Sequence, residues 1–532
     1  MSKVELAPIT SPIAPHHEEP ARVIGSVGAF SIVAGSMIGV GIFLFSDEIA
    51  RGVGSLPMVI AMVLLGGFFA LSGSAACGEL GAMMPKAGGD YVFQRAAYGR
   101  SVAFASGWVL FAAIFAGSTA TLAIATTQYQ IGPLLGYPAF PNMTEPLLGP
   151  FNGAQVGGIG IILLFTLLND LGTSLSARAQ TILTLSPIVL MLGLGGYVLI
   201  AQPAVVVPPT GDELGALPEM LTFGGIASAF LAVNFIFSGW INIIYVASEV
   251  KEPGKTIPRS MFSATIAVTL LYLVMIAMFV AVLGMSGLAS KGSPALGFEQ
   301  GTRVANALGS PVLGTIVLVT IMLAILTSVN ATIMAAARVG YAMSRDGALW
   351  KPMGKLSMSG VPRRALWFHA LLACLIALTG TADAIGEMTS LAMFVTGSLT
   401  VFAMYVLRVK LPDLARPYRA NSVMPALYVL LAVFAIAAKL AAAVEEPGVK
   451  AWYPLVGLGI LAVTWVGHLI YLRQWKSAAV VGVGFLLGGA LFDSATRPSA
   501  LAAVSPTAAF AEAHASIHQE SVPAHDVRPL TP

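Results

Sequence analysis

The chain has 532 residues, of which 57% are apolar and only 10% are charged. A soluble protein carries about a quarter of its residues as Asp, Glu, Lys and Arg, which cover its surface. This shortfall excludes a soluble globular protein and indicates that most of the surface faces lipid. The net charge of +3 is too small to indicate a nucleic-acid partner.

Twelve apolar stretches are long enough to cross a bilayer. A membrane helix needs roughly 20 mostly apolar residues, and in lipid its backbone groups must find partners within the segment. The stretches are residues 24–50, 57–80, 101–129, 154–172, 180–201, 222–248, 260–285, 311–334, 365–381, 386–407, 424–444 and 452–472. We therefore predict an all-α membrane protein with 12 transmembrane helices.

These spans divide the chain into four regions. Residues 1–23 form a polar N-terminal segment, residues 24–409 hold the first ten helices, and residues 424–472 hold the last two. Residues 473–532 contain a short apolar run at 478–492, which we expect at the interface or packed on the bundle. The end of this region is rich in Ala, Pro, Ser and His, and we expect a disordered tail.

The basic residues predict the orientation of the chain, because Lys and Arg concentrate in cytoplasmic loops. With the N-terminus in the cytoplasm, only five of the 28 Lys and Arg residues fall outside. These are Arg51, Lys291, Arg303, Lys439 and Lys450. We expect a multi-pass protein of the cell (inner) membrane with both termini in the cytoplasm.

Glycine clusters interrupt the first and sixth spans near their middle. The first cluster runs from Gly35 to Phe43 and the second from Phe235 to Trp240. Paired breaks at matching positions are typical of inverted-repeat transporters. A break frees backbone N–H and C=O groups in the bilayer, which is tolerated where they line a cavity. The alternative, that the glycines only allow close helix packing, is less favoured for two matching clusters.

Together the two breaks would bind both ends of a zwitterion. A half-helix that begins at a break directs its positive dipole end at the cavity, which suits a carboxylate. A half-helix that ends there offers carbonyls, which suit an ammonium group. No Asp or Glu lies near either break. This absence favours amino acids over the alternative, a polyamine or other organic amine, because a diamine needs acidic partners.

Other polar residues within the spans have two interpretations. Glu79, Asp170 and Glu249 lie at expected cytoplasmic helix ends. Carboxylates inside membranes are functional by default, but these three can also reach interfacial water or a nearby arginine. Thr327 and Ser328 lie midway along the eighth span, where their hydroxyls either ligate a cation or bond back to the helix.

Nothing in the sequence indicates a cofactor, a metal cluster or an enzyme. Cys77 and Cys374 lie far apart in apolar stretches and suggest neither a disulfide nor a metal site. His468 is alone in the last span and is interpreted as a packed core histidine. A membrane-embedded enzyme would need clustered His, Asp or Glu at mid-membrane depth. A channel would need a ring of charges or a filter-like repeat.

Several stretches, in order along the chain, resemble the amino acid–polyamine–organocation (APC) transporters. The stretches are Gly35–Phe43, Glu79–Tyr91, Asn234–Trp240, Ser248–Pro253, Ile257–Arg259, Ser328–Arg338, Tyr341–Gly347 and Leu411–Arg419. The resemblance runs from about Gly25 to Arg419. It implies a leucine-transporter-type fold, with a five-plus-five inverted repeat and two C-terminal helices. It also implies secondary active transport of amino acids by alternating access.

The resemblance also implies the residues that bind substrate. Backbone N–H groups after the first break would meet the carboxylate, and carbonyls beside both breaks would meet the amine. Phe235 matches the family's aromatic gate, and Ser238 and Gly239 would line the side-chain pocket. The implied residues are Met37, Gly39, Val40, Gly41, Phe235, Ile236, Phe237, Ser238 and Gly239.

Two departures from the family's pattern bear on coupling and specificity. Many relatives carry a lysine in helix five where this chain has Pro187, and some have Asn where Ile241 follows Trp240. Without the lysine, a cation held by helix-one carbonyls and Thr327 or Ser328 is one way to couple transport. Exchange of one amino acid for another is the alternative. Symport with H⁺ or Na⁺ and exchange both stay open.

Overall fold

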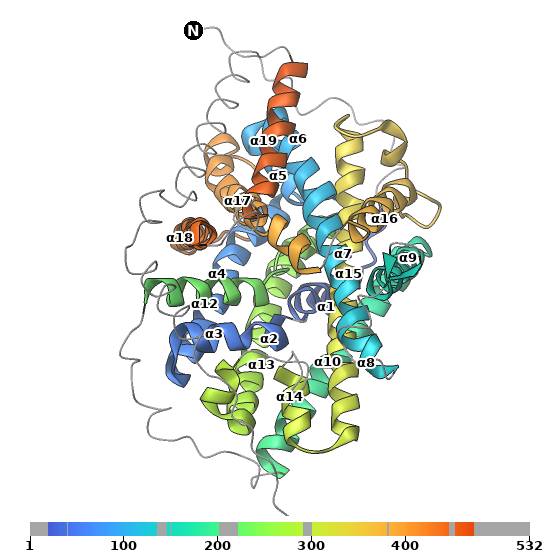
Figure 1. The fold of residues 1–532 in the computed structure, drawn as a ribbon. Helices are drawn as coiled ribbons and strands as arrows, with labels where there is room; N and C mark the ends of the chain where they lie inside the picture. Colours follow the sequence, from blue (N-terminus) through green and yellow to red (C-terminus); the bar gives the residue numbers. More distant parts are fainter. Residues whose placement is uncertain are drawn as a thin grey trace, which may run out of the picture. The chain divides into compact units, whose positions relative to one another are not determined.

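A computed structural model of the chain describes residues 20–39, 41–135, 146–148, 151–201, 222–290, 300–379, 382–445 and 453–472. Helices make up nearly all of this part of the chain (Figure 1). Its strands form one short antiparallel hairpin, β1 (Pro146–Leu148) and β2 (Phe151–Asn152). The predictions for residues 1–19 and 473–532, including the apolar run 478–492, lie outside the described residues.

The helices follow one another along the chain. In the first part of the chain they are α1 (Ser26–Met37), α2 (Gly41–Leu44), α3 (Ser46–Val53), α4 (Leu56–Met83), α5 (Asp90–Tyr98), α6 (Arg100–Trp108), η1 (Val109–Phe115), α7 (Ala116–Ala125), η2 (Thr126–Ile131), α8 (Gly132–Leu134), α9 (Gly153–Asp170), α10 (Thr173–Gly196) and η4 (Tyr197–Ala201). They continue with α12 (Phe223–Ile236), η5 (Asn242–Glu249), α13 (Pro253–Ala289), α14 (Gln300–Ala307), α15 (Pro311–Arg345), η6 (Lys351–Gly354), α16 (Arg363–Ala377), α17 (Ala382–Lys410), α18 (Val423–Glu445) and α19 (Tyr453–Tyr471).

Within the described chain, nine helices are long and apolar enough to cross a membrane. The other three predicted spans, the sixth, ninth and twelfth, contain α12, α16 and α19. α12 has 14 residues because the sixth span breaks after Ile236. α16 has 15 residues, and the apolar part of α19 is Leu458–Tyr471. The prediction of an all-α membrane protein is confirmed.

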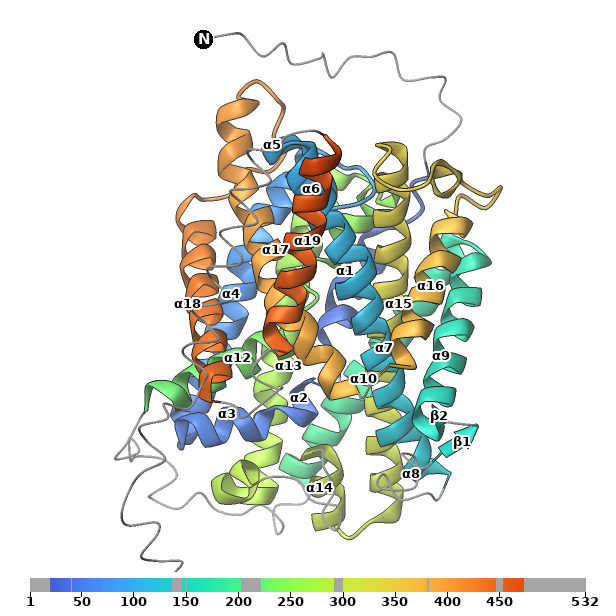
Figure 2. The same ribbon diagram turned by 45° about the horizontal axis from the view of Figure 1, so that its top comes forward.

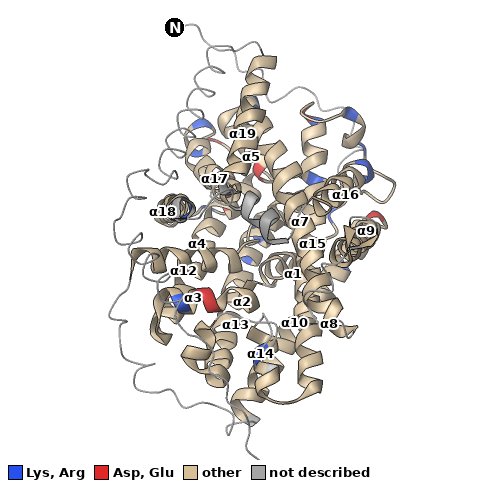
Figure 3. Ribbon diagram, viewed as in Figure 1, with Lys and Arg blue, Asp and Glu red and all other residues tan. Residues whose placement is uncertain are grey.

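The surface of the helices fits a lipid environment. Figure 3 shows the ribbon almost entirely in the colour of uncharged residues. Large apolar side chains are exposed on the outer helices, with Leu164 at 62%, Ile182 at 66%, Leu430 at 65% and Val463 at 72%. Extensive apolar exposure of this kind marks a surface that something apolar covers. The length and hydropathy of the helices indicate that lipid covers these exposed apolar side chains.

Local sequence signals set several helix boundaries. Asn152 and Gln155 form a capping box at the start of α9, in which each side chain accepts the other residue's backbone N–H at 2.9 and 3.0 Å. The hydroxyl of Ser310 caps α15 just before a proline at the first helical position. α3 ends at Gly54, whose φ of 69° is left-handed. These signals are local, so the boundaries follow from the sequence.

Helix α1 lies at the centre of the bundle. In Figures 1 and 2 it lies among α10, α13 and α15, and it packs against all three. The side chains of Val33 and Ala34 are fully buried there. Polar groups released by a break at the end of α1 therefore face protein or a cavity, and not lipid.

Candidate functional site

Both glycine clusters interrupt their helices. α1 ends at Met37, and Ile38 leaves the helical conformation with ψ of 87°. The chain resumes as a helix at Gly41, while Val40 lies outside the described residues. In the sixth span, α12 ends at Ile236, and the helix resumes as the 3₁₀ segment η5. The φ of Gly239, in the turn between them, is +105°, which favours glycine.

The two breaks touch each other. The hydroxyl of Tyr272 in α13 lies 2.7 Å from the Met37 carbonyl and 2.8 Å from the Ile236 carbonyl, so its one proton serves both. A Cβ added at Gly239 would lie 2.7 Å from the Ser36 carbonyl carbon. A Cβ added at Gly41 would lie 3.1 Å from the Cα of Ile236. Gly239 therefore permits an approach that a side chain would block, and a side chain at Gly41 would be a tight fit.

Several backbone groups expected at the substrate already have partners. The N–H of Gly39 donates to the Met37 carbonyl at 2.9 Å. The Phe235 carbonyl accepts from the N–H and the hydroxyl of Ser238, at 3.1 and 2.7 Å. Among the described residues, we find no hydrogen bond to the Phe237 carbonyl. That oxygen is therefore available to an amine, while the Gly41 N–H, at the start of α2, lacks an intrahelical partner.

The half-helix after the first break is short. α2 has four residues, and Phe45, with φ of −107°, connects it to α3. Its macrodipole is correspondingly small, since the effect comes from aligned peptide groups. A carboxylate at Gly39 to Gly41 would thus depend on individual N–H groups more than on the dipole of a long helix.

The residues expected to line the pocket divide into exposed and buried side chains. Phe235 is 41% exposed, and its ring lies 4.7 Å from that of Phe45. Ser238 is half-buried, whereas Ile236 and Phe237 are each 1% exposed. The ring of Phe237 packs edge-on against Tyr272 at 5.2 Å. Phe235 and Ser238 therefore have the accessible side chains, and Ile236 and Phe237 contribute backbone.

The hydroxyls of the eighth span turn toward helices one and five. Ser328 donates to the Gly35 carbonyl at 3.0 Å. The Oγ1 of Thr327 lies 3.0 Å from that of Thr184, which also lies 3.0 Å from the Ser31 carbonyl. Neither Thr327 nor Ser328 has a described bond back to its own helix. Thr184, one turn before Pro187 in α10, was not singled out by the sequence.

A buried amide network extends this polar cluster. Asn330 donates to the Gln180 side chain at 2.7 Å and accepts from Asn169 at 2.8 Å. A Cβ added at Gly35 would lie 2.8 Å from the Gln180 Nε2 and 3.0 Å from the Thr327 hydroxyl. Helices one, four, five and eight therefore meet through uncharged polar groups.

A family model described as amino acid permease matches residues 24–466, most of the chain and both breaks. The chain belongs to the amino acid permease family. As expected from the motifs, it is an APC-superfamily transporter of amino acids.

Similar proteins carry names that agree with this assignment. The permease is 26% identical over 418 residues to the large neutral amino acids transporter small subunit 2 of Homo sapiens, which covers 78% of this chain and 75% of the relative. It is 27% identical over 427 residues to the Asc-type amino acid transporter 1 of Mus musculus, with coverage of 78% and 75%. It is 25% identical over 426 residues to the cystine/glutamate transporter of Homo sapiens, with coverage of 79% and 80%.

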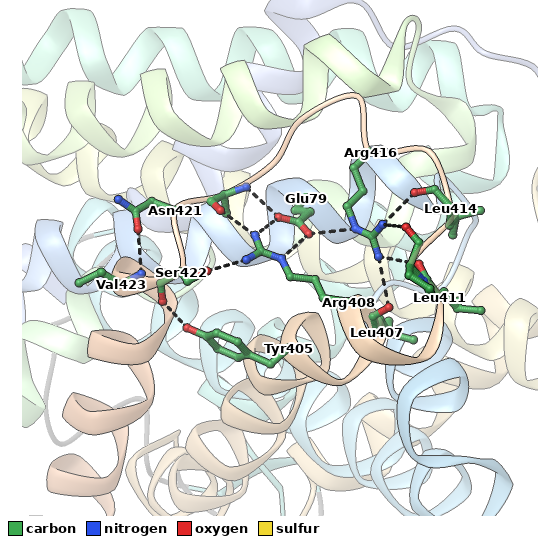
Figure 4. Close-up of polar contacts among 12 residues, drawn as sticks. Glu79, Tyr405, Leu407, Arg408, Leu411, Leu414, Arg416, Asn421, Ser422 and Val423 are labelled. Atoms are coloured by element: carbon green, nitrogen blue, oxygen red, sulfur yellow. Dashed lines mark hydrogen bonds and ion pairs between the residues drawn. The ribbon is translucent and has the colours of Figure 1, made fainter.

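Each of the three carboxylates at expected cytoplasmic helix ends pairs with an arginine in the permease. Figure 4 shows Glu79 of α4 between Arg408 and Arg416, with N–O distances of 2.5 and 3.4 Å. Asp170 meets Arg363 through two hydrogen bonds of 2.5 and 2.9 Å. The third, Glu249, pairs with an arginine of α15. The interpretation that a nearby arginine holds them is confirmed.

The Glu249 pair ties together the ends of four helices. Glu249 accepts two hydrogen bonds from Arg338, at 2.8 and 3.1 Å, and both side chains are almost fully buried. Arg338 also donates to the Thr173 hydroxyl at 3.0 Å. The N–H of Ile24 donates to the Glu249 carbonyl at 2.9 Å, and the Lys251 N–H donates to the Ile24 carbonyl at 2.8 Å. Helices one, five, six and eight are thereby closed at this end.

Asp90 adds a second buried carboxylate contact to helix six. It is the first residue of α5 and is 3% exposed. The Tyr245 hydroxyl donates to its Oδ2 at 2.8 Å, and the Gly88 N–H donates to the Tyr245 carbonyl at 3.0 Å. The other oxygen, Oδ1, has no partner in the described part of the chain. Burial raises the pKa of Asp90 to about 6.

Proposed function

We propose that the permease carries neutral amino acids through a site at the two helix breaks, by alternating access. The observation that carries this proposal is the contact between the two breaks at the centre of the bundle. The chain has no Asp, Glu, Lys or Arg in residues 26–46 or 222–248, which hold both breaks. Uncharged walls disfavour a charged side chain, because burying an unpaired charge is costly.

In this proposal the backbone recognises the two charged ends that all amino acids share. The N–H groups of Val40 and Gly41 receive the carboxylate, and that of Gly39 joins them when its hydrogen bond to the Met37 carbonyl breaks. The carbonyls beside the breaks receive the amine, and that of Phe237 is available to it because those of Met37, Phe235 and Ile236 already hold hydrogen bonds. The full set of proposed substrate-binding residues is Met37, Gly39, Val40, Gly41, Phe235, Ile236, Phe237, Ser238 and Gly239.

The side-chain pocket lies between Phe235, Ser238 and Gly239, with Ile241 making it less polar. Phe235 acts as the gate on the side away from the Glu249 network. Its 41% exposure, together with the burial of Glu249 and Arg338, supports an arrangement that is closed toward the network. The distribution of Lys and Arg supports an orientation with this closed side and both termini in the cytoplasm.

Counterflow in proteoliposomes tests the substrate class. Liposomes preloaded with an unlabelled compound should take up labelled neutral amino acids, and should take up polyamines and other organic amines poorly. The matched pair of an amino acid and its decarboxylated amine isolates the contribution of the carboxylate. Equal uptake of that pair would refute the proposed carboxylate site.

For coupling we propose exchange, in which an amino acid on one side is swapped for one on the other. The polar cluster supports this mechanism, because Thr184, Thr327 and Ser328 have protein partners without an ion. Gln180 also places an amide N–H near the Ser31 carbonyl, at 3.4 Å. Uptake that requires internal amino acid and ignores imposed sodium and proton gradients is the expected result.

The second candidate is cation symport, which a different feature of the same cluster favours. The carbonyls of Ser31 and Gly35 converge with the hydroxyls of Thr327 and Ser328, and such oxygens suit a sodium ion. Sodium-driven accumulation that is lost in Ser328→Ala would support this candidate over exchange. Accumulation driven only by protons would oppose both and direct attention to Asp90 and the three paired carboxylates.

A further inference from the structure

A cavity of about 370 Å³ lies beside the start of helix one and carries an unbalanced positive charge. Its charged lining residues are Arg22, Arg178 and Lys251, which come from three separate segments of the chain. Arg22 precedes α1, Arg178 lies in the second turn of α10, and Lys251 follows η5. None of the lining residues is Asp or Glu. We call this cavity the basic groove.

Within the described residues, the three cations of the basic groove lack the carboxylate partners that several arginines near the same helix ends have. Arg338, Arg363 and Arg408 are each paired with a carboxylate. In contrast, the described residues include no ion pair or side-chain hydrogen bond for any of the three groove cations, and all three are exposed. Three like charges around one cavity repel each other unless an anion lies between them.

Apolar surface continues from the basic groove along the same two helices. Val23 is 39% exposed and Val27 is 62% exposed at the start of helix one. On α10, Leu175 is 45% exposed and Ile182 is 66% exposed. α1 and α10 pack against each other, so the charged cavity and an apolar face adjoin. This combination fits an amphiphile better than a soluble anion.

We propose that the basic groove binds the phosphate headgroup of an anionic phospholipid, whose acyl chains lie along α1 and α10. Basic pockets between membrane helices recognise such headgroups by charge. The bound phosphate would bridge Arg22, Arg178 and Lys251. It would thereby link helix one to helix five and to the segment after helix six, beside the Glu249–Arg338 pair. Lipid binding therefore stabilises the closed arrangement of that end.

Native mass spectrometry of the delipidated permease with phosphatidylglycerol tests this site. The control lipid is phosphatidylcholine with the same acyl chains, and the soluble control is glycerol 3-phosphate. Juxtamembrane cations contribute about 1 kcal/mol each, which is about fivefold in affinity. The combined variant R22Q/R178Q/K251Q should therefore bind phosphatidylglycerol about 100-fold more weakly than the wild type.

The matched control removes three other exposed cations without described partners, as R259Q/K351Q/K355Q. It should bind phosphatidylglycerol within about twofold of the wild type. Unchanged binding by the groove variant, equal losses in both variants, or equal binding of phosphatidylcholine would each overturn the proposal. If glycerol 3-phosphate binds as tightly as phosphatidylglycerol, the basic groove is a site for soluble anions and the lipid proposal is refuted. If the groove variant does not fold, R178Q and K251Q separately should each lose about fivefold.

Discussion

Gly239 lies where the two broken helices touch, which makes it the most direct test of the site. A Gly239→Ala substitution adds one methyl group in the turn between α12 and η5. That methyl group would lie 2.7 Å from both the carbonyl carbon and the Cβ of Ser36. The substitution leaves charge and hydropathy nearly unchanged, so its effect is geometric.

Two terms set the magnitude of the Gly239→Ala effect. The contact with Ser36 must lengthen by more than about 0.7 Å to reach 3.4 Å, where ordinary van der Waals contact begins, because the Ser36 carbonyl oxygen would lie closer still than the carbonyl carbon. Because the carbonyl group of Ser36 belongs to backbone, relief requires moving one break relative to the other. In addition, a φ of +105° costs a non-glycine residue about 1–3 kcal/mol. A loss of about 2 kcal/mol in substrate binding corresponds to a roughly 30-fold lower initial uptake rate at low substrate concentration.

Initial uptake of a labelled neutral amino acid into proteoliposomes measures the effect, normalised to the amount of reconstituted protein. Gly224→Ala is the matched control, because Gly224 lies in α12 of the same span and an added Cβ there has no neighbour within 4 Å. The control should transport within about twofold of the wild type. If Gly239→Ala transports as well as Gly224→Ala, the two breaks do not form the substrate site together.

Three further substitutions probe the gate, the link between the breaks and the buried acid. Phe235→Ala should lower uptake at least tenfold. The melting temperature should change little, because the ring is 41% exposed. Uptake equal to that of the wild type would refute the role of Phe235 as the gate. Tyr272→Phe leaves the Ile236 carbonyl without its hydroxyl partner, which costs about 1–3 kcal/mol. Both stability and uptake should therefore fall. Unchanged stability and uptake would refute the role of the Tyr272 hydroxyl in linking the two breaks. The pKa of Asp90, about 6, exceeds the ordinary 3.8, so its contribution to stability is present at low pH and is lost as the pH rises through 6. Asp90→Asn should therefore stabilise the permease by about 3 kcal/mol at pH 8, by about half of that near pH 5 and hardly at all below pH 3.8, and melting shifts that do not depend on pH would contradict this.

The parts of the fold that the sequence predicts are those set by local composition. Lipid requires long uncharged helices, so the spans follow from hydropathy alone. The breaks follow from the glycine clusters 35–43 and 235–240, because glycine is the residue that tolerates a positive φ and a close backbone approach. The length of α2 does not follow, since nothing between Gly41 and Leu44 indicates a helix end.

The parts that the sequence does not predict depend on contacts between distant segments. Tyr272 reaches a carbonyl 235 positions earlier in the chain, and no motif marks it among the apolar residues of α13. Thr184 and Gln180 are ordinary polar residues of helix five until packing brings them beside Gly35. The carboxylates show the same limit. An arginine partner could be expected for each, but the identity of a partner such as Arg408, 329 positions after Glu79, comes only from the folded chain.

The closed end of the bundle also bears on how transport is coupled. Opening that end must separate four contacts: Arg338 with Glu249, Arg338 with Thr173, and the two backbone hydrogen bonds of Ile24 with Glu249 and Lys251. At about 1 kcal/mol net for each, these contacts leave about one molecule in 1,000 of the empty protein in the open state at equilibrium. A substrate bound with millimolar affinity supplies about 4 kcal/mol, enough to offset those contacts if it binds the opening state more tightly than the closed one. A carrier that reorients only when loaded must return with another substrate molecule, and this is the physical reason that we favour exchange and expect uptake to require internal amino acid.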